Sequence, residues 1–531
     1  MPNLTLSTLD VSLAVVGVWL ILKLSRRHLR SVKVSNVAGP PSVSWLYGAT
    51  EEIYSNGSAA THEKWEKIYG SVYRVPAALG SSWIVVLDTK ALSHIFSKDA
   101  STYVQPAFMK QSIFGKGLMW SEGEDHRRQR KVLNPLFNVT SIRSKVPALF
   151  GSAYKIKDAW ESIIQQSSDD EVIIDISKWL NGFSIDSIGL SLFDHDFGAL
   201  DGTDPEIPKL IDSLGTRPTK FETLISRLSF ALPILQKIPT TRSRTIDSIH
   251  KWLGETSNTL LEQHSRDADT SDRSIVATLL MAEESQKMSP DEVLTQMRTL
   301  ILAGYEATAI GLTFALMDLA KTPEAQNRLR KEIQSLPTGE PAHNQILNSE
   351  ALPYLSAVTL ETLRLHPPVG QIIRVASSIS IAAQDDVLPL NYPIAGKDGE
   401  SLVNITIPKG TQVNIPLRSI NLSDAFWGPN AKDFVPERWL DKEKKIPKRA
   451  KEVQGYHHML TFLDGNRMCL GHNIAVASIK TALAILVGNF IFEMRDGPDT
   501  KVESIMNMFS RPKVAGEEGY AMPLKVRAID V

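Results

Sequence analysis

The sequence predicts a mainly α-helical fold with a small β region, and three patterns support this. Residues 140–288 have the periodicity of helices joined by polar connections. Ser289 is followed by a proline and, three residues after it, by a glutamate, so a helix begins here and continues to about Ala320. Strand-like sequence is clearest at 71–75 and 83–87, which flank a Gly-Ser-Ser turn and indicate a hairpin.

Length and composition favour one large globular body over several domains. Within the 531 residues we find no internal repeat, no Pro/Gly/Ser-rich linker and no long block of like charges. The 43% of hydrophobic residues are sufficient for a substantial core. The formal net charge of −1 gives no global reason to expect nucleic acid as a partner, and we expect none.

The N-terminus has the pattern of a membrane anchor. Leu4 to Leu24 is mostly apolar and would be ~30 Å long as a helix, enough to cross a bilayer, although Asp10 interrupts it. A cleaved signal needs a small-residue cleavage site, whereas basic residues follow here: Lys23, Arg26, Arg27, Arg30 and Lys33. We therefore favour an uncleaved anchor at 1–24, a basic and Pro-rich tether at 25–41 and a cytosolic body at 42–531, over a signal peptide or an ordinary helix.

The segment 462–471 contains Cys469, the only cysteine of the chain. One thiol excludes an intrachain disulfide, a zinc site built from several cysteines and an iron–sulfur cluster, but it is sufficient as the thiolate ligand of a haem iron. Gly465 and Gly471 on either side allow tight backbone turns close to the sulfur. Arg467 is placed to reach a haem propionate, and Phe462 to shield the ligand from water. The alternative is a buried core cysteine in a glycine-rich turn.

The pattern Phe-x-x-Gly-x-Arg-x-Cys-x-Gly resembles the haem-ligand loop of the cytochrome P450 family at all its fixed positions. Four further landmarks occur in the order and spacing of that family, so the resemblance covers about residues 40 to 525. It implies a cytochrome P450 fold, with 42–531 as the haem-thiolate catalytic domain and Cys469 as the iron ligand. The overall pattern resembles membrane-anchored fungal members of secondary metabolism.

The first two of these landmarks concern haem and oxygen. His126 and Arg130 are four residues apart on one predicted helix, so they share a face, and in the resembled family such a pair holds the haem propionates. A solvated basic helix face is the alternative. Arg374, which begins an extended stretch, is a further expected propionate ligand. Glu306 and Thr308 match the family's oxygen-binding segment and are expected to deliver protons.

One departure from the family affects that expectation. Ala307 stands where the resembled segment has a hydroxyl residue next to the acid. Thr308 is rotated ~100° around the helix, so it cannot take the same place, and we favour an ordered water near Glu306 or a hydroxyl of the substrate. The surrounding small residues recur at helical spacing and form one face, which fits either a flat ligand or close helix packing: Leu300, Ala303, Gly304, Ala307, Thr308 and Gly311.

The remaining two landmarks are structural. Glu361 and Arg364 are three apart and resemble the family's Glu-x-x-Arg helix, and Arg438 is expected to complete a buried ion-pair network with them. These residues are expected to support the haem-binding core without taking part in catalysis.

The resemblance implies a monooxygenase that inserts one oxygen atom of O2 into an apolar small molecule, for which a terpenoid or related secondary metabolite is our hypothesis. The chain has no flavin or nicotinamide fingerprint, so NADPH-cytochrome P450 reductase is the expected electron donor. Basic residues between 442 and 451 could steer an acidic partner, or form a solvated loop. The expected location is the endoplasmic reticulum membrane. A haem-thiolate isomerase or dehydratase, or a haem-binding sensor, are the alternatives.

Overall fold

The computed structural model describes residues 36–55, 58–106, 117–203, 206–214, 219–229, 235, 238–266, 274–336, 345–377, 385–506 and 509–529. The predicted anchor and most of the tether lie outside these residues. The described residues fall into two compact units. The first comprises the described residues up to Pro106, those within Thr223–Lys237 and those within Ile372–Pro416. The second comprises the described residues within Ala107–Glu222, Ile238–Gln371 and Leu417–Val531.

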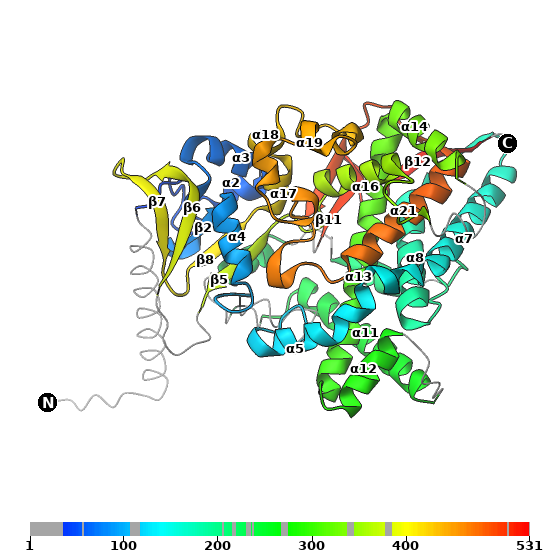
Figure 1. The fold of residues 1–531 in the computed structure, drawn as a ribbon, viewed down its shortest axis with the longest axis horizontal. Coiled ribbons are helices and arrows are strands. Elements are labelled where there is room, and N and C mark those ends of the chain that lie inside the picture. Colours follow the sequence, from blue (N-terminus) through cyan, green and yellow to red (C-terminus); the bar gives the residue numbers. More distant parts are fainter. Residues whose placement is uncertain are drawn as a thin grey trace. The chain divides into compact units, whose positions relative to one another are not determined.

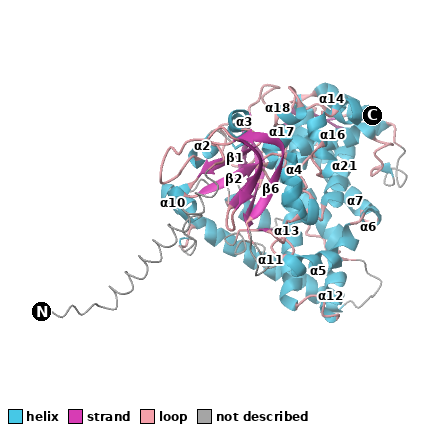
Figure 2. Cartoon of the chain, turned by 60° about the vertical axis from the view of Figure 1, so that its left-hand side comes forward, coloured by secondary structure: helices cyan, strands magenta, loops and turns pink. Residues whose placement is uncertain are grey.

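The first unit contains most of the β structure. Its five-stranded sheet has the order β1-β2-β8-β5-β3, in which only the β2–β8 pair is parallel. In Figure 2 these strands and the β6–β7 hairpin gather in one region. The elements are α2 (Thr50–Ser55), α3 (Ser58–Tyr69), β1 (Val72–Pro76), β2 (Ser82–Val86), α4 (Thr89–Ser97), β3 (Tyr103–Val104), β5 (Ile372–Ala376), β6 (Asp386–Ala395), β7 (Ser401–Ile407) and β8 (Gln412–Ile415).

The predicted hairpin is confirmed, because β1 and β2 pair antiparallel with Val72 opposite Val86. The end of the tether packs on this hairpin, where Arg74 donates its backbone N–H to the carbonyl of Ala38 at 2.9 Å. A Cβ atom at Gly39 would lie 1.8 Å from the carbonyl oxygen of Arg74, so only glycine allows this approach.

The second unit is mainly helical, and Figure 1 shows α7, α8, α13 and α21 packed together in it. Its helices are α5 (Gly123–Leu133), α6 (Val139–Arg143), α7 (Val146–Gln165), α8 (Ile176–Ile188), α9 (Glu206–Ser213), α11 (Thr241–Arg266), α12 (Ile275–Glu284), α13 (Pro290–Lys321), α14 (Pro323–Gln334), α16 (Pro353–Leu365), α17 (Leu417–Leu422), α18 (Asp424–Trp427), α19 (Lys442–Lys445), α20 (Lys448–Lys451) and α21 (His472–Asn489). Helix α10 (Lys220–Ser229) crosses the division between the units.

Short sheets complete the second unit. Strand β12 (Pro523–Ala528) pairs with both β4 (Glu171–Asp175) and β9 (Phe490–Met494), and all pairs are antiparallel. Strands β10 (Val502–Met506) and β11 (Ser510–Val514) form a hairpin, and β11 contacts α13. Through this contact a C-terminal strand brings its side chains to the middle of the central helix.

Helix α13 begins and ends as the sequence predicts. Ser289 and Glu292 form the capping box, in which each side chain bonds the other's backbone N–H, and Pro290 is the first helical residue. The helix packs against α8, α11, α16 and α21, so it lies in the core. Within the described residues it is also the one helix long and apolar enough to span a membrane, but 78% of its most apolar window is buried in the protein. We therefore assign α13 as a core helix.

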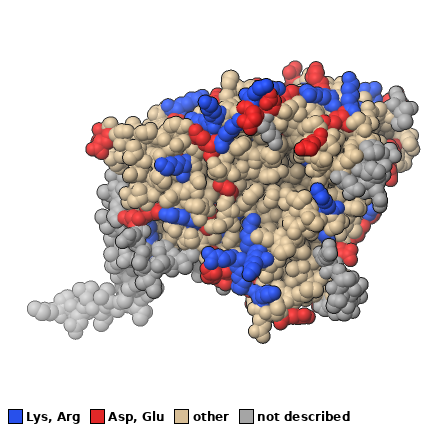
Figure 3. Space-filling model, in the orientation of Figure 1, with Lys and Arg blue, Asp and Glu red and all other residues tan. Residues whose placement is uncertain are grey.

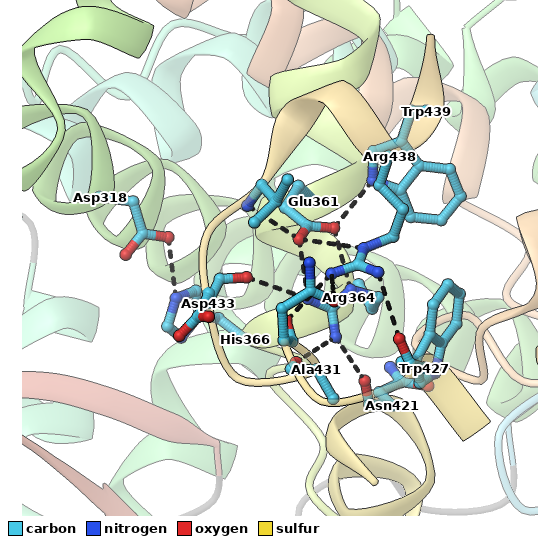
Figure 4. A network of polar contacts seen from close by, with 12 residues as sticks. Asp318, Glu361, Arg364, His366, Asn421, Trp427, Ala431, Asp433, Arg438 and Trp439 are labelled. Atoms are coloured by element: carbon cyan, nitrogen blue, oxygen red, sulfur yellow. Dashed lines mark hydrogen bonds and ion pairs between the residues drawn. The ribbon is translucent and has the colours of Figure 1, made fainter. Parts of the chain in front are cut away.

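A buried ion-pair network ties α16 to the chain that follows α17 (Figure 4). Glu361 and Arg364 are both fully buried and bond through two contacts of 2.8 and 2.9 Å. Arg438 lies 3.5 Å from Glu361, and the indole N–H of Trp439 donates to the same carboxylate at 2.9 Å. The remaining guanidinium donors of Arg364 bond the backbone carbonyls of Asn421, Ala431 and Asp433. The predicted network of Glu361, Arg364 and Arg438 is thereby confirmed.

We predict that Arg364→Ala lowers the free energy of unfolding by about 3–5 kcal/mol, because the buried Glu361 carboxylate loses its two shortest ion-pair contacts and keeps only the longer contact to Arg438 as a charged partner. Arg328→Ala is the matched control, since Arg328 pairs with Glu437 at 2.9 Å but is half exposed, and its loss should cost less than about 1 kcal/mol. Urea unfolding of both variants measures the difference. Equal costs would contradict a structural role for the buried pair.

Candidate active site

The cysteine loop is held by its own backbone directly before α21. The N–H of Cys469 donates to the carbonyl of Phe462 at 2.8 Å, which closes the loop. Gly465 has a φ of 65°, so the predicted need for glycine is real at this position. Gly471 has an ordinary φ of −86°, and a Cβ there would meet only Ile474, at 3.6 Å. The packing of the protein itself therefore does not demand glycine at 471.

The groups around the Cys469 sulfur have opposing effects on the pKa of its thiol. Cys469 is an exposed residue. Desolvation by the protein atoms around the sulfur raises the pKa of the Cys469 thiol, whereas a hydrogen bond from the N–H of Gly471 and the charge of Arg130 lower it. No side chain within the described residues caps the first turn of α21, so the positive end of the helix dipole also faces this loop. A bound metal ion would complete the deprotonation.

Helix α5 carries His126 and Arg130 on its inner side. His126 is buried and Arg130 half-buried, whereas Arg127 and Lys131 are exposed, so the predicted pair does share one face. Burial lowers the pKa of the Arg130 guanidinium, and the charge of Cys469 opposes this shift. Within the described part of the chain, no hydrogen bond or ion pair engages that guanidinium, so it is available to an anionic group.

Two other predicted arginines have protein partners. Arg467 donates to the backbone carbonyl of Met119 at 3.0 Å and to that of Ser121, which ties the cysteine loop to the start of α5. Arg374 lies on β5 in the first unit, where its guanidinium bonds both carboxylate oxygens of Asp99 at 2.9 Å. The predicted binding of a propionate by Arg467 and Arg374 stays a prediction, and these contacts give both side chains a structural role.

The small residues of α13 separate into two sets. Ala303, Gly304 and Ala307 remain partly exposed in the middle of a helix whose flanking turns are buried. A Cβ at Gly304 would lie 3.2 Å from Ile188 of α8, and one at Gly311 would lie 3.3 Å from Ile479 of α21. The glycines therefore serve close helix packing, and the two alanines leave accessible apolar surface beside them.

The two residues expected to deliver protons lie in different surroundings. Thr308 is buried and its hydroxyl donates to the carbonyl of Gly304 at 3.1 Å, within its own helix. Glu306 is fully buried, and its Oε1 accepts from Arg511 Nε at 3.0 Å. Burial raises the pKa of Glu306 to about 7, although the charge of Arg511 lowers it. A carboxyl group that titrates near neutral pH is suited to exchange protons.

Comparison of the sequence with known proteins shows the family to which the chain belongs. The sequence profile described as Cytochrome P450 matches residues 38–517. The chain belongs to the cytochrome P450 family. It is 40% identical to cytochrome P450 monooxygenase claP and 41% identical to claQ, both of Ampulloclitocybe clavipes, with all of each chain covered. Cytochrome P450 monooxygenase 205 of Postia placenta is 30% identical over 98% of both chains.

Family membership makes this cytochrome P450 a haem-dependent monooxygenase, with a cysteine thiolate as the family's axial ligand. The residues present fit a haem. The sulfur lies beside the positive end of α21, the Arg130 guanidinium is available for a propionate, and the alanines of α13 leave accessible apolar surface. Among the described residues no cluster of three or more His, Cys, Asp or Glu side chains could hold a metal ion.

Three connecting residues of this cytochrome P450 were missed by sequence reasoning. Asn421 and Thr461 join the buried network to the cysteine loop, since the Asn421 amide donates to the Thr461 hydroxyl at 2.9 Å and accepts from the N–H of Leu460 at 3.0 Å. Thr461 also donates to the carbonyl of Leu363 in α16 at 2.6 Å. Arg511, the partner of Glu306, is the third. Single polar residues in irregular segments give no local sequence signal for such contacts.

We predict that Arg130→Ala and Arg467→Ala have different effects. Arg130→Ala should speed haem loss to apomyoglobin by about tenfold or more, because one charge-assisted hydrogen bond to a propionate is removed. Arg467→Ala should lower the free energy of unfolding by about 2 kcal/mol, because two backbone carbonyls lose their donor.

The matched control is Arg127→Ala, on the exposed side of α5, which should change neither quantity appreciably. Unchanged haem retention in Arg130→Ala would contradict the propionate assignment.

Proposed function

We propose that this cytochrome P450 inserts one oxygen atom of O2 into an apolar small molecule, with Cys469 as the axial ligand of its haem. The observation that carries the proposal is the loop from Phe462 to Gly471, closed by its own backbone and ending at the uncapped start of α21. A thiolate-bound haem supplies the activation of dioxygen, because electron donation from sulfur favours cleavage of the O–O bond. His126 and Arg130 bind the propionates. Glu306 and Thr308 are the two candidates for proton delivery, and Glu306 is the one that we favour, because the Thr308 hydroxyl is engaged with Gly304.

The substrate class that we propose is a terpenoid or related lipid-like secondary metabolite. The partly exposed Ala303 and Ala307 support an apolar substrate, since they offer methyl groups and no hydrogen-bonding group. A screen of apolar ligands that follows the shift of the haem spin state tests this class. Binding confined to polar or charged compounds would contradict it.

Electrons are proposed to come from NADPH-cytochrome P450 reductase. Figure 3 shows basic side chains gathered over α5, where Arg127 and Lys131 are exposed. The lysines of α19 and α20 are a weaker attraction for an acidic partner, because Lys444 pairs with Asp441 at 3.6 Å and Lys451 with Glu443 at 3.0 Å. Steering by such charges should weaken as ionic strength rises.

We further propose that residues 1–24 anchor the enzyme in the endoplasmic reticulum membrane, with the catalytic domain in the cytosol. The apolar run and the basic residues after it support this orientation. Removal of residues 1–30 should reduce partitioning into membranes and leave haem binding intact. Unchanged partitioning would contradict the anchor.

We predict that Cys469→Ser abolishes the strongly red-shifted absorbance that reduced, carbon monoxide-bound thiolate haem proteins show, together with turnover. The reason is that a serine hydroxyl does not replace a thiolate as the electron-donating ligand. The measurement is the carbon monoxide difference spectrum of wild type and variant at equal haem content. Persistence of the band in the variant would refute the assignment of the ligand.

We predict that coupling, the product formed per NADPH consumed, depends on Glu306 and much less on Thr308. The Thr308 hydroxyl already bonds Gly304, and Ala307 has no hydroxyl. Glu306→Gln should lower coupling by about tenfold or more and raise hydrogen peroxide, because a proton donor is lost. Thr308→Ala should change coupling little.

The same assay tests the alternatives. A collapse of coupling in Thr308→Ala alone would make the threonine the proton relay. Product formation without NADPH consumption would instead identify an isomerase or dehydratase. Haem binding without any turnover would identify a sensor.

A further inference from the structure

The hairpin of β10 and β11 lies between two arginines that differ in their partners. Strand β11 lies beside both α13 and α17 (Figure 1). In the pairing of the two strands, Ser504 is opposite Pro512. Because side chains alternate along a strand, Ser504 and Ser510 share one face of the hairpin and Arg511 belongs to the other.

The charge of Arg511 is compensated by carboxylates. Arg511 is almost completely buried, and it pairs with Glu306 of α13 at 2.9 Å and with Asp212 of α9. Burial lowers the pKa of the Arg511 guanidinium, but the charges of Glu306 and Asp212 outweigh this effect and raise it. The buried guanidinium of Arg374 likewise has the carboxylate of Asp99 as its partner.

The arginine on the other face of the hairpin has no carboxylate partner. Arg418 of α17 is only partly exposed, and its Nη1 donates to the hydroxyls of Ser504 at 3.0 Å and Ser510 at 3.3 Å. Its Nε and Nη2 make no hydrogen bond or ion pair within the described residues, and both remain accessible. Burial lowers the pKa of this guanidinium, and no charged group in the described part of the chain opposes the shift.

Backbone contacts hold the guanidinium and the two hydroxyls in place. The N–H of Arg418 donates to the carbonyl of Gly370 at 2.9 Å, and the N–H of Ser510 donates to the carbonyl of Pro368 at 2.9 Å. The hydroxyl oxygens of Ser504 and Ser510 lie 2.5 Å apart. These polar groups therefore converge without a ligand, and a ligand that binds them does not have to order them first.

The chemistry of this cluster fits a carboxylate. The planar fork of a guanidinium matches the two oxygens of a carboxylate, and Nε with Nη2 forms one edge of that fork. No second cation contacts the two serines among the described residues, so a singly charged group suits the site better than a phosphate. Taking a cation out of water without a counter-charge is costly, so an anion would complete the site.

We propose that Arg418, held by Ser504 and Ser510, binds the carboxylate of a small acid. The carboxylate accepts hydrogen bonds from Nε and Nη2 of the guanidinium, while the two hydroxyls fix Nη1. The carboxylate belongs either to the substrate or to a separate acid. In the first case the inference rests on the proposed function and narrows the substrate class to lipid-like metabolites that carry an acid group.

The test measures the binding of hexanoate to the haem-loaded full chain by isothermal titration calorimetry, with hexanamide as its neutral counterpart. The two ligands share an apolar chain and differ in charge. Wild type should bind hexanoate at least about tenfold more tightly than hexanamide, and Arg418→Gln should remove this preference, because charge-assisted hydrogen bonds are lost. The control is Arg328→Gln, whose guanidinium pairs with Glu437 elsewhere, and it should keep the preference.

Two further variants keep the test decisive if Arg418→Gln fails to fold. Arg418→Lys keeps the positive charge without the planar fork and should keep part of the preference. Ser504 is exposed, and Ser504→Ala should weaken hexanoate binding by about twofold to tenfold, because the guanidinium loses one of its hydrogen bonds. Equal binding of hexanoate and hexanamide by wild type, unchanged hexanoate affinity in the variants, or tighter binding of inorganic phosphate would overturn the carboxylate site.

The haem spectrum distinguishes the two sources of the carboxylate. Binding that depends on Arg418 and shifts the haem spin state supports an acid group on the substrate. Binding that depends on Arg418 without such a shift supports a separate acid. The proposed function is tested independently by the carbon monoxide spectrum, so a normal spectrum without any preference for hexanoate would refute this inference alone.

Discussion

The ion pair between Glu361 and Arg364 is the constraint on which the helical unit depends. Both side chains are fully buried, and taking two charges out of water costs several kcal/mol per ion even inside a relaxed protein. The pair is tolerated only because backbone carbonyls, Arg438 and the Trp439 indole satisfy the remaining donors and acceptors. The chain from 421 to 439 must therefore follow one course around α16, since any other would leave a buried charge unpaired.

Two small polar side chains connect the buried ion pair to the segment that leads into the cysteine loop. The backbone carbonyl of Asn421 accepts a hydrogen bond from Arg364. The Asn421 side-chain amide donates to the Thr461 hydroxyl and accepts from the N–H of Leu460. Thr461 in turn donates to a backbone carbonyl of α16. The loop also closes on itself at Cys469. Hydrogen bonds around a metal ligand orient it toward the metal, and here they connect the loop to the helices beside it. The buried pair and the thiolate ligand are thus parts of one hydrogen-bonded structure.

Helix α13 brings two incompatible environments to the same turn. One face offers methyl groups and accessible apolar surface, and another carries a buried carboxylate paired with an arginine. A helix permits this because neighbouring residues point ~100° apart while the backbone satisfies its own hydrogen bonds. The capping box fixes the start of the helix, and the packing against α8 and α21 holds the helix in place, so each face keeps its own surroundings. A loop could not hold the two environments so close together without exposing backbone to the apolar side.

The sequence alone determined those features that depend on neighbours a few residues apart. These are the capping box at Ser289, the β1–β2 hairpin, the shared face of His126 and Arg130, and the spacing around Cys469. It also determined the family, because a lone cysteine between fixed glycines and an arginine is a specific pattern. The tertiary structure decided the partners of charged side chains. Arg467 bonds carbonyls some 346 residues away, and Arg511 pairs with an acid 205 residues away. Such pairs form only when packing brings distant segments together, and an isolated arginine in a sequence carries no record of which oxygen it will meet.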